Sequence, residues 1–244
     1  MFYILLITLS ILIFGSFLVQ RMHNLFSIKV IFNRKYPIKI ENTENNKIIK
    51  VDNDGNEKLC QSIRNLKIKF LGKNNKIILH ENVHFTRSEI ILTGNNITFE
   101  IGKNSTFDKL YAIVSGSEKG NIVKIGENFF NTHKLEIFAG GGENNNLYIG
   151  NNVLCSRQIS IYTHDGHSIH NFSKGNILNN SKNDLIIGNN VWIGHGVIIL
   201  KNTQIKDNTI IGAGSVVCGS YDSYNSIIAG NPAKIVKENV YWNK

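Results

Sequence analysis

The chain of 244 residues is poor in residues that break or cross-link a fold, with two prolines and three cysteines. Cys60, Cys155 and Cys218 are widely separated and lack metal-ligand spacing, so they indicate reduced core thiols in a cytosolic compartment. Charged residues make up only 18% of the chain and hydrophobic residues 42%, enough for a substantial core. Glycine and asparagine are abundant, and because both tolerate a positive φ they favour tight turns between short strands over long helices.

A nucleic-acid-binding motif is also missing, although the net charge is +9. The basic residues are scattered, and no segment combines aromatic and basic residues in the pattern of DNA- or RNA-binding modules. We therefore expect no nucleic-acid partner and interpret the charge as a solvated surface with a membrane-proximal basic segment. Attraction of an acidic acceptor or cofactor is the alternative.

Residues 2–19, FYILLITLSILIFGSFLV, contain no charge and approach the shortest length that spans a bilayer. The segment has neither the basic start nor the small-residue cleavage site of a signal peptide, which favours an uncleaved anchor. Basic residues follow it and none precede it, so the body of the protein is predicted to face the cytoplasm. Because the span is short, a buried or interfacial helix of a soluble fold is the alternative.

From residue 187 the sequence repeats every six residues, as IGNNVW, IGHGVI, ILKNTQ, IKDNTI, IGAGSV and VCGSYD. An aliphatic residue opens each hexad, and a small or β-branched residue fills the fifth place of the first five hexads. A period of six fits neither an α-helix nor a lone amphipathic strand. It indicates a chain wound into flat-sided coils in which every sixth side chain points inward.

Weaker repeats lie upstream, where Ile101, Ile125 and Ile149 are spaced by 24 residues. This spacing fits an eighteen-residue, three-sided coil with a six-residue excursion, and it fits a larger coil equally well. The interval from Ile149 to Ile187 is longer, so a loop interrupts the stack there.

Residues 161–170 of this loop, IYTHDGHSIH, gather three of the eight histidines of the chain. His164, Asp165 and His167 are possible metal ligands, but no distant ligand of matching spacing exists, so we expect no metal. An imidazole that titrates near neutrality also suits proton transfer. We interpret His164 and His170 as loop or surface residues.

The segments IIGNNVWIGHGVIIL, IIGAGSVV and AGNPAKIVKEN resemble the hexapeptide-repeat acyltransferases. The combination with DGHSI is similar to O-acetyltransferases of bacterial capsule and lipopolysaccharide sugars. The resemblance is specific from about Tyr162 to the end and diffuse from about Leu66 to Ile161. It implies an all-β fold, a left-handed parallel β-helix preceded by an N-terminal apolar helix. The expected organisation is an anchor (1–20), a basic linker or N-terminal cap (21–65), a β-helix domain (66–236) with a catalytic loop (162–184), and a C-terminal tail (237–244).

The resemblance also implies a mechanism of direct acetyl transfer from acetyl-CoA to a sugar hydroxyl. His167 matches the position of the general base, Asp165 would orient its imidazole, and Trp192 would lie beside the reacting groups. Backbone N–H groups near Gly194 and His195 would stabilise the oxyanion. No covalent enzyme intermediate is expected.

The C-terminal coils resemble an acetyl-CoA site in which small residues admit the pantetheine arm and a lysine meets a phosphate. The expected cofactor-binding residues are His195, Gly212, Ala213, Ser215, Ala229 and Lys234. Expected partners are a saccharide acceptor (capsule, lipopolysaccharide or nucleotide sugar) and two further copies of the chain in a homotrimer. The expected location is the cytoplasmic face of the inner membrane.

Two other functions fit parts of the sequence. An N-acetyltransferase acting on a nucleotide-linked amino sugar would keep the same fold. A non-catalytic β-solenoid scaffold or adhesin would have no reason to combine a histidine loop, VWIG and a basic AGNPAK segment.

Overall fold

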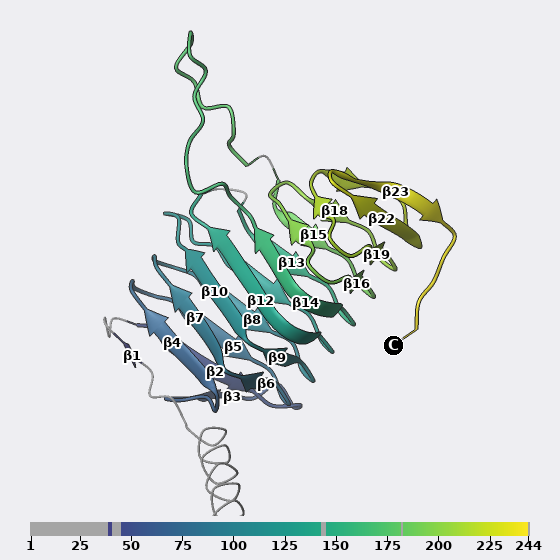
Figure 1. Ribbon diagram of the computed structural model, residues 1–244. Helices are drawn as coiled ribbons and strands as arrows, with labels where there is room; N and C mark the ends of the chain where they lie inside the picture. Colours follow the sequence, from purple (N-terminus) through teal and green to yellow (C-terminus); the bar gives the residue numbers. More distant parts are fainter. Residues whose placement is uncertain (1–38, 41–44, 143–144, 182, 244) are drawn as a thin grey trace, which may run out of the picture. The chain divides into compact units, whose positions relative to one another are not determined.

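The computed structural model describes residues 39–40, 45–142, 145–181 and 183–243, all of which lie in the second of two compact units, residues 36–244. Within these residues the secondary structure is entirely β, and the strands form coils with three faces, here called A, B and C (Figure 1). Face A contains β6 (His84–Thr86), β9 (Thr106–Asp108), the first parts of β12 (Phe130–Gly140) and β14 (Leu154–Tyr162), β16 (Trp192–Ile193), β19 (Ile210–Ile211) and β22 (Ser226–Gly230).

Face B contains β1 (Lys39–Ile40), β4 (Leu66–Phe70), β7 (Ser88–Leu92), β10 (Leu110–Ser115), the last parts of β12 and β14, β17 (Ile198–Ile199) and β20 (Val216–Val217). Face C contains β2 (Lys47–Val51), β5 (Lys76–Leu79), β8 (Thr98–Ile101), β11 (Ile122–Ile125), β13 (Leu147–Ile149), β15 (Leu185–Ile187), β18 (Gln204–Ile205) and β21 (Ser220–Tyr221). Pairing between successive coils is parallel. Antiparallel β3 (Glu57–Leu59) pairs with β2 at one end, and antiparallel β23 (Ala233–Glu238) pairs with β22 at the other.

The register decides between the two coil sizes that the sequence left open. Ile101 pairs with Ile125 and Ile125 with Ile149, so one complete coil upstream holds 24 residues. Ile193 pairs with Ile211, so a C-terminal coil holds 18. The larger coils have longer strands, six residues in β10 and eleven in β12, whereas strands β15 to β21 of the C-terminal coils have two or three. The upstream spacing therefore reflects a larger coil.

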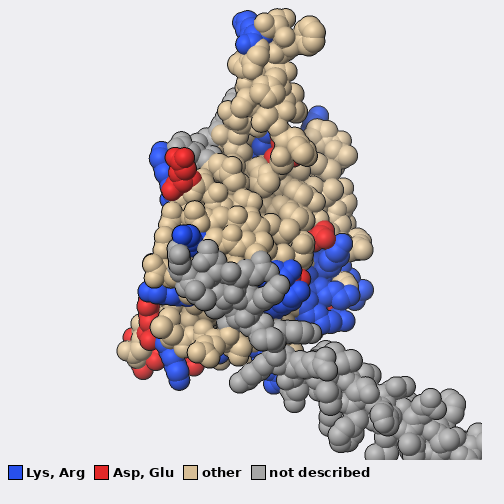
Figure 2. Space-filling model, turned by 90° about the vertical axis from the view of Figure 1, so that its left-hand side faces the viewer, with Lys and Arg blue, Asp and Glu red and all other residues tan. Residues whose placement is uncertain are grey.

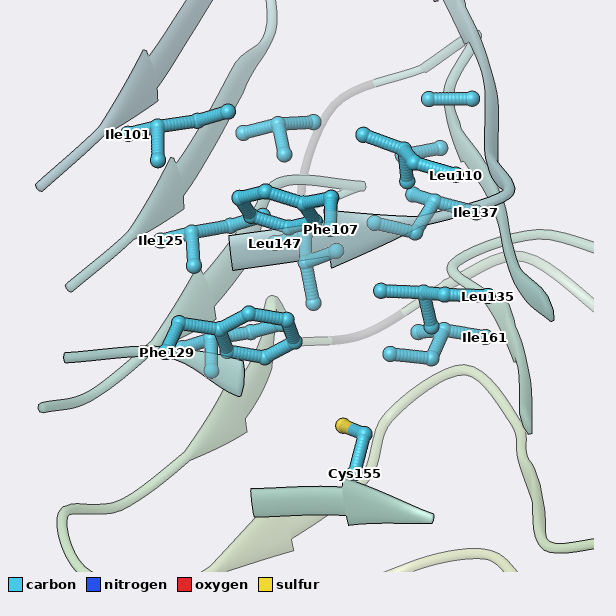
Figure 3. Packing of buried hydrophobic residues seen from close by; sticks show 14 of the residues in the cluster. Ile101, Phe107, Leu110, Ile125, Phe129, Leu135, Ile137, Leu147, Cys155 and Ile161 are labelled. Carbon is cyan, nitrogen blue, oxygen red and sulfur yellow. The ribbon is translucent and has the colours of Figure 1, made fainter. Parts of the chain in front are cut away.

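The core is a column of inward side chains, because alternate residues of each strand point to opposite faces of the sheet. Phe107 stacks on Phe85 and Phe129, with ring centroids 5.4 and 5.0 Å away, and aliphatic side chains of faces B and C surround the rings (Figure 3). Cys155 is buried in this column, and burial raises the pKa of its thiol. Cys218 is exposed on a turn, so the prediction that all three cysteines are core residues is wrong for this one.

Asparagines form the corner between faces C and A. One asparagine per coil adopts a positive φ there, at positions 82, 104, 128, 152, 190, 208 and 225. Asparagine tolerates this left-handed conformation better than other residues that carry a Cβ. Side-chain amides also bond from coil to coil, as Asn128 Nδ2 does to Asn152 Oδ1 at 2.9 Å. The abundance of asparagine therefore reflects a repeated backbone requirement.

Replacing Asn128 with alanine should lower the free energy of unfolding by roughly 1–2 kcal/mol, because a Cβ without a compensating amide is strained at this φ. Asn128→Gly is the matched control, since glycine accepts the φ of 56° and loses only the coil-to-coil hydrogen bond. Denaturation midpoints of the two variants measure the difference. Equal stabilities would show that the left-handed corner does not select the residue.

The predicted anchor, residues 1–20, and most of the predicted linker or cap up to residue 44 lie outside the described residues. From Lys47 the chain already belongs to the stack, because β2 pairs in parallel with β5. None of the described segments is a helix with the length and hydropathy needed to span a bilayer.

Candidate active site

The histidine-containing loop replaces a tight turn between faces B and C. β14 ends at Tyr162 and β15 begins at Leu185, whereas the equivalent turn of the next coil takes only residues 200–203. The loop projects from the stack (Figure 1), and its two arms pair through Leu178 N and Ile169 O at 2.7 Å. Figure 2 shows this projection with few charged groups, while Lys and Arg gather lower in the same view. Its apolar side chains are exposed, and Phe172 contacts solvent over its entire surface.

His164 is half-buried at the base of the loop and its Nδ1 accepts a hydrogen bond from Gly166 N at 3.0 Å. In the neutral imidazole the hydrogen therefore sits on Nε2. Burial lowers the pKa of His164, and the charge of Lys201 lowers it further, although Asp165 opposes this effect. A neutral ring with its free lone pair already engaged is suited to donate a hydrogen bond rather than to accept a proton.

His167 differs from His164 in being exposed. Among the described residues none forms a hydrogen bond with its imidazole, while its backbone carbonyl accepts one from Asn179 Nδ2 at 2.8 Å. The backbone of His167 is thus fixed and its ring nitrogens remain available. His170 is also exposed, and its Nδ1 lies 3.0 Å from Gly175 O within the loop, as expected for a surface residue.

Asp165 does not orient His167 as the sequence suggested. Its Oδ2 accepts hydrogen bonds from Lys201 Nζ at 2.5 Å and from Asn179 Nδ2 at 2.6 Å. Burial alone would raise the pKa of Asp165, but these hydrogen bonds and the charge of Lys201 outweigh it and hold the pKa below its usual range. Lys201 also bonds to Asn179 O. The carboxylate therefore fastens the loop to the coil beneath it.

Sequence reasoning missed both partners of Asp165. Asn179 bonds to Asp165, to His167 O and to Ile169 N, so it links the two arms of the loop. Lys201 lies two residues after Ile199, and Ile199 pairs with Ile161 in the preceding coil. The hexad register alone would have placed this lysine under the start of the loop.

A cleft of about 350 Å³ lies against the loop. Its walls are mostly polar and combine the loop with the end of β10 and the turn after β12: Ser115, Gly141, Asn145, His164, Asp165, Gly166, His167, Ser168, Asn179, Asn180 and Ser181. Within the described residues, no three His, Cys, Asp or Glu side chains come together as a metal site would require. The cleft offers hydroxyl, amide and imidazole groups, the groups that hydrogen-bond to a sugar.

Trp192 does not line this cleft. It lies on β16 of face A beside Leu154, the first residue of β14, whereas the loop follows the last residue of β14 on face B. Its side chain is 38% exposed. One chain therefore presents His167 and Trp192 at different corners of the coil.

The turn between β16 and β17, residues 194–197, carries the backbone N–H groups that were predicted to stabilise the oxyanion. Gly194 N donates to Ile211 O and Gly196 N donates to Arg157 O, both at 2.9 Å. Of the four turn residues, 194–197, His195 and the buried Val197 have N–H groups that donate to no backbone carbonyl of the described chain. The side chain of His195 is exposed. The N–H groups of Gly194 and Gly196 are therefore already engaged, and His195 is the exposed residue of this turn whose N–H has no backbone acceptor.

The C-terminal coils place the predicted cofactor-binding residues differently. Ala213 and Lys234 are exposed and Ala229 is half-buried. Gly212 is required by packing, because a Cβ there would lie 2.8 Å from the Ala229 Cβ. Ser215 is fully buried, and its hydroxyl donates to Gly212 O at 2.6 Å and accepts from Gly230 N at 3.1 Å. The Ser215 hydroxyl therefore serves the interior of the coil and faces no ligand, which corrects the prediction for this residue.

Lys201→Met should lower kcat by about tenfold, because freeing the loop misplaces the catalytic groups. The pKa of Asp165 is depressed, so its carboxylate stays charged until the pH falls below the usual carboxylate range, and the defect should be constant from about pH 5 to 8. Lys206→Met is the matched control, since Lys206 makes an exposed 3.7 Å pair with Asp222. Steady-state kinetics that leave Lys201→Met within twofold of the parent would refute the fastening role.

Comparison with known proteins agrees with this architecture. The bacterial transferase hexapeptide (six repeats) family matches residues 184–219. The polysialic acid O-acetyltransferase of Neisseria meningitidis is 31% identical over 193 residues, which cover 71% of this chain and 78% of that protein. The solved structure of the polysialic acid O-acetyltransferase OatWY superposes with a TM-score of 0.62 at 27% identity, covering 86% of this chain and 92% of that one.

Shorter alignments have higher identity. The galactoside O-acetyltransferase of Escherichia coli is 44% identical over 54 residues, which cover 22% of this chain and 26% of that protein. In these shorter alignments the chain covers about a third or less of the length of each curated relative. The long alignment with the Neisseria protein, together with the coils and the loop, confirms the predicted resemblance, and the chain belongs to the hexapeptide-repeat acetyltransferases, alongside the polysialic acid O-acetyltransferases.

Proposed function

We propose that this chain is an acetyl-CoA-dependent O-acetyltransferase that modifies a sugar hydroxyl of a bacterial surface polysaccharide. The observation that carries the proposal is the free imidazole of His167 on a fixed loop beside a polar cleft, in a chain of this family. The relatives named above act on polysialic acid or a galactoside, so a saccharide acceptor is the class that they support.

In this proposal one nitrogen of His167 removes the proton of the acceptor hydroxyl as its oxygen attacks the acetyl carbonyl carbon. The tetrahedral oxyanion receives a hydrogen bond from the N–H of the exposed residue His195, which donates to no backbone carbonyl among the described residues. Collapse of the intermediate breaks the carbon–sulfur bond, and the imidazolium returns the proton to the departing thiolate. His164, kept neutral by burial, donates from Nε2 to the acceptor.

The described residues fit acetyl-CoA along the C-terminal coils. Ala213 is exposed beside Gly214, where an added Cβ would meet nothing within 4 Å. The surface there is therefore open to an extended pantetheine arm. Lys234 is exposed on β23, and its ammonium can meet a phosphate. The thioester would supply the acetyl group. The left-handed winding of the coils is inferred from the family.

A homotrimer is the assembly that we propose, because one chain keeps His167 and Trp192 apart. Ile169, Phe172 and Leu178 expose large apolar side chains on the projecting loop, which a neighbouring chain would cover. If the site combines the loop of one chain with the coils of another, mixing His167→Ala with Trp192→Ala chains should restore activity at about a quarter of the interfaces. No recovery over the separate variants, or a purely monomeric active protein by light scattering, would contradict the composite site.

The acceptor is identified by measuring acetyl-CoA consumption against purified capsular and lipopolysaccharide glycans and against nucleotide-linked amino sugars. We expect turnover with a polysaccharide that carries free hydroxyls. Turnover confined to amino sugars would identify an N-acetyltransferase, and binding without turnover of any acceptor would identify a scaffold.

Residues 2–19 are proposed to hold the protein at the cytoplasmic face of the inner membrane. The support is their uncharged composition and the basic residues that follow. Deletion of residues 1–20 should move the protein from the membrane fraction to the soluble fraction while acetyl transfer is retained. A full-length protein that is soluble without detergent would contradict the anchor.

A further inference from the structure

The C-terminal segment runs back along the stack after β23. Val240 N donates to Asn225 O at 2.9 Å, and Trp242 Nε1 donates to Asn190 O at 2.8 Å. Asn190 and Asn225 occupy the same corner in different coils, with Asn208 between them, and all three have a positive φ. The segment therefore follows the asparagine corner toward earlier coils (Figure 1).

This return brings together the two tryptophans of the chain, Trp192 and Trp242. Their ring centroids are 6.1 Å apart and the planes are tilted by 47°. Asn190, which accepts the hydrogen bond from Trp242, lies only two residues before Trp192. The tail is thus fixed to the same corner that presents Trp192.

Among the described residues, Trp192 makes one side-chain hydrogen bond besides its contact with Trp242. Its Nε1 lies 3.4 Å from Ser156 Oγ, a long hydrogen bond, and its side chain is 38% exposed on a two-residue strand. The hydrogen bond that Trp242 donates goes to the backbone carbonyl of Asn190, and it fixes the Trp242 ring beside Trp192 at a separation where aromatic pairs attract each other. Removing Trp242 would take away the aromatic ring that packs beside Trp192.

We propose that Trp242 is a positioning residue that holds the indole of Trp192 in its working orientation in the acetyl-transfer site, an inference that rests on the proposed function. The C-terminal tail then forms part of the wall beside the reacting groups. A tail that only covers the end of the stack would not need to contact Trp192.

The pair itself is tested by circular dichroism of the full-length protein. Because the chain has two tryptophans, a couplet from coupled indoles should be present in the parent and absent from both Trp192→Phe and Trp242→Phe. A parent spectrum that equals the sum of the two single-tryptophan spectra would overturn the inference without bearing on acetyl transfer.

The positioning role is tested by kinetics. Trp242→Phe keeps a ring but loses the N–H, and it should lower kcat roughly threefold. Trp242→Ala loses the ring as well and should lower kcat roughly tenfold. Acrylamide should also quench the fluorescence of Trp192 more readily in the alanine variant than in the phenylalanine variant. Tyr241→Ala is the control, because Tyr241 is 81% exposed beside Trp242. The thermal midpoint of Trp242→Phe should match the parent, so its kinetic loss is not one of folding.

A Trp242→Ala protein with kcat within twofold of the parent would refute positioning. A parent that shows the couplet but transfers acetyl to no saccharide would instead remove the proposed function and the catalytic part of this inference with it.

Discussion

Replacing His167 with alanine should lower kcat for acetyl transfer by roughly 10²–10⁴, the usual contribution of a general base, with little change in the KM for acetyl-CoA. The alcohol oxygen of a sugar becomes an effective nucleophile only as its proton leaves. The imidazole of His167 is exposed beside the cleft and has no hydrogen-bond partner among the described residues, so its nitrogens remain available for that proton.

The other loop histidines provide matched controls. His164→Ala should cost much less than His167→Ala, because His164 Nδ1 already accepts from Gly166 N. His170→Ala should have little effect, since His170 Nδ1 contacts Gly175 O away from the cleft. If His164→Ala were the crippling change, the base would be misassigned. If a chelator abolished activity and zinc restored it, the metal-free mechanism would be wrong.

Replacing Phe107 with alanine should lower the free energy of unfolding by about 3–5 kcal/mol, the range seen when a buried aromatic leaves a cavity. Phe107 is fully buried between Phe85 and Phe129, so its removal breaks a continuous column and the coils on both sides lose contact. In stacked repeats each coil is stabilised mainly by its neighbours, so a gap in the middle cannot be compensated locally.

Phe172→Ala is the control for this loss, because Phe172 is fully exposed on the loop and its removal should change the free energy of unfolding by less than about 0.5 kcal/mol. Urea denaturation of both variants provides the comparison. A Phe107→Ala protein as stable as Phe172→Ala would show that the aromatic column is not a main source of stability.

The C-terminal coils could be predicted almost residue by residue, because a strict period of six determines which side chains point inward. The aliphatic residues that open the hexads are buried, as are Val191, Val197, Thr203, Thr209 and Ser215 in the fifth place. The same reasoning should have excluded Ser215 from the cofactor site, since an inward position cannot also face a ligand.

The upstream coils were less predictable for a geometric reason. A spacing of 24 residues is a whole number of hexads, so both coil sizes place Ile101, Ile125 and Ile149 on one inward row. The difference lies between faces B and C, where the step from Ile137 to Ile149 takes twelve residues and the equivalent step from Ile199 to Ile205 takes six.

The candidate site, like the fold, could be predicted from the sequence only in part. The loop and His167 could be predicted from an interruption of the repeat and from a resemblance. The link from Asp165 to Lys201 could not be, because the pairing of a long loop with the next coil depends on its conformation. The contact between Trp192 and Trp242 joins residues 50 positions apart through a tail that follows no repeat.

The bond formed to the transferred acetyl group tests the central claim most directly. Purified full-length protein is incubated with labelled acetyl-CoA and the polysaccharide that supports turnover, and the product is then treated with mild alkali. An O-acetyl ester is released by this treatment, whereas an N-acetyl amide is retained. The structure and the family predict label that appears on the polysaccharide, depends on His167 and is lost in alkali. Alkali-stable label, or equal labelling by the parent and His167→Ala, would contradict O-acetyl transfer by this site.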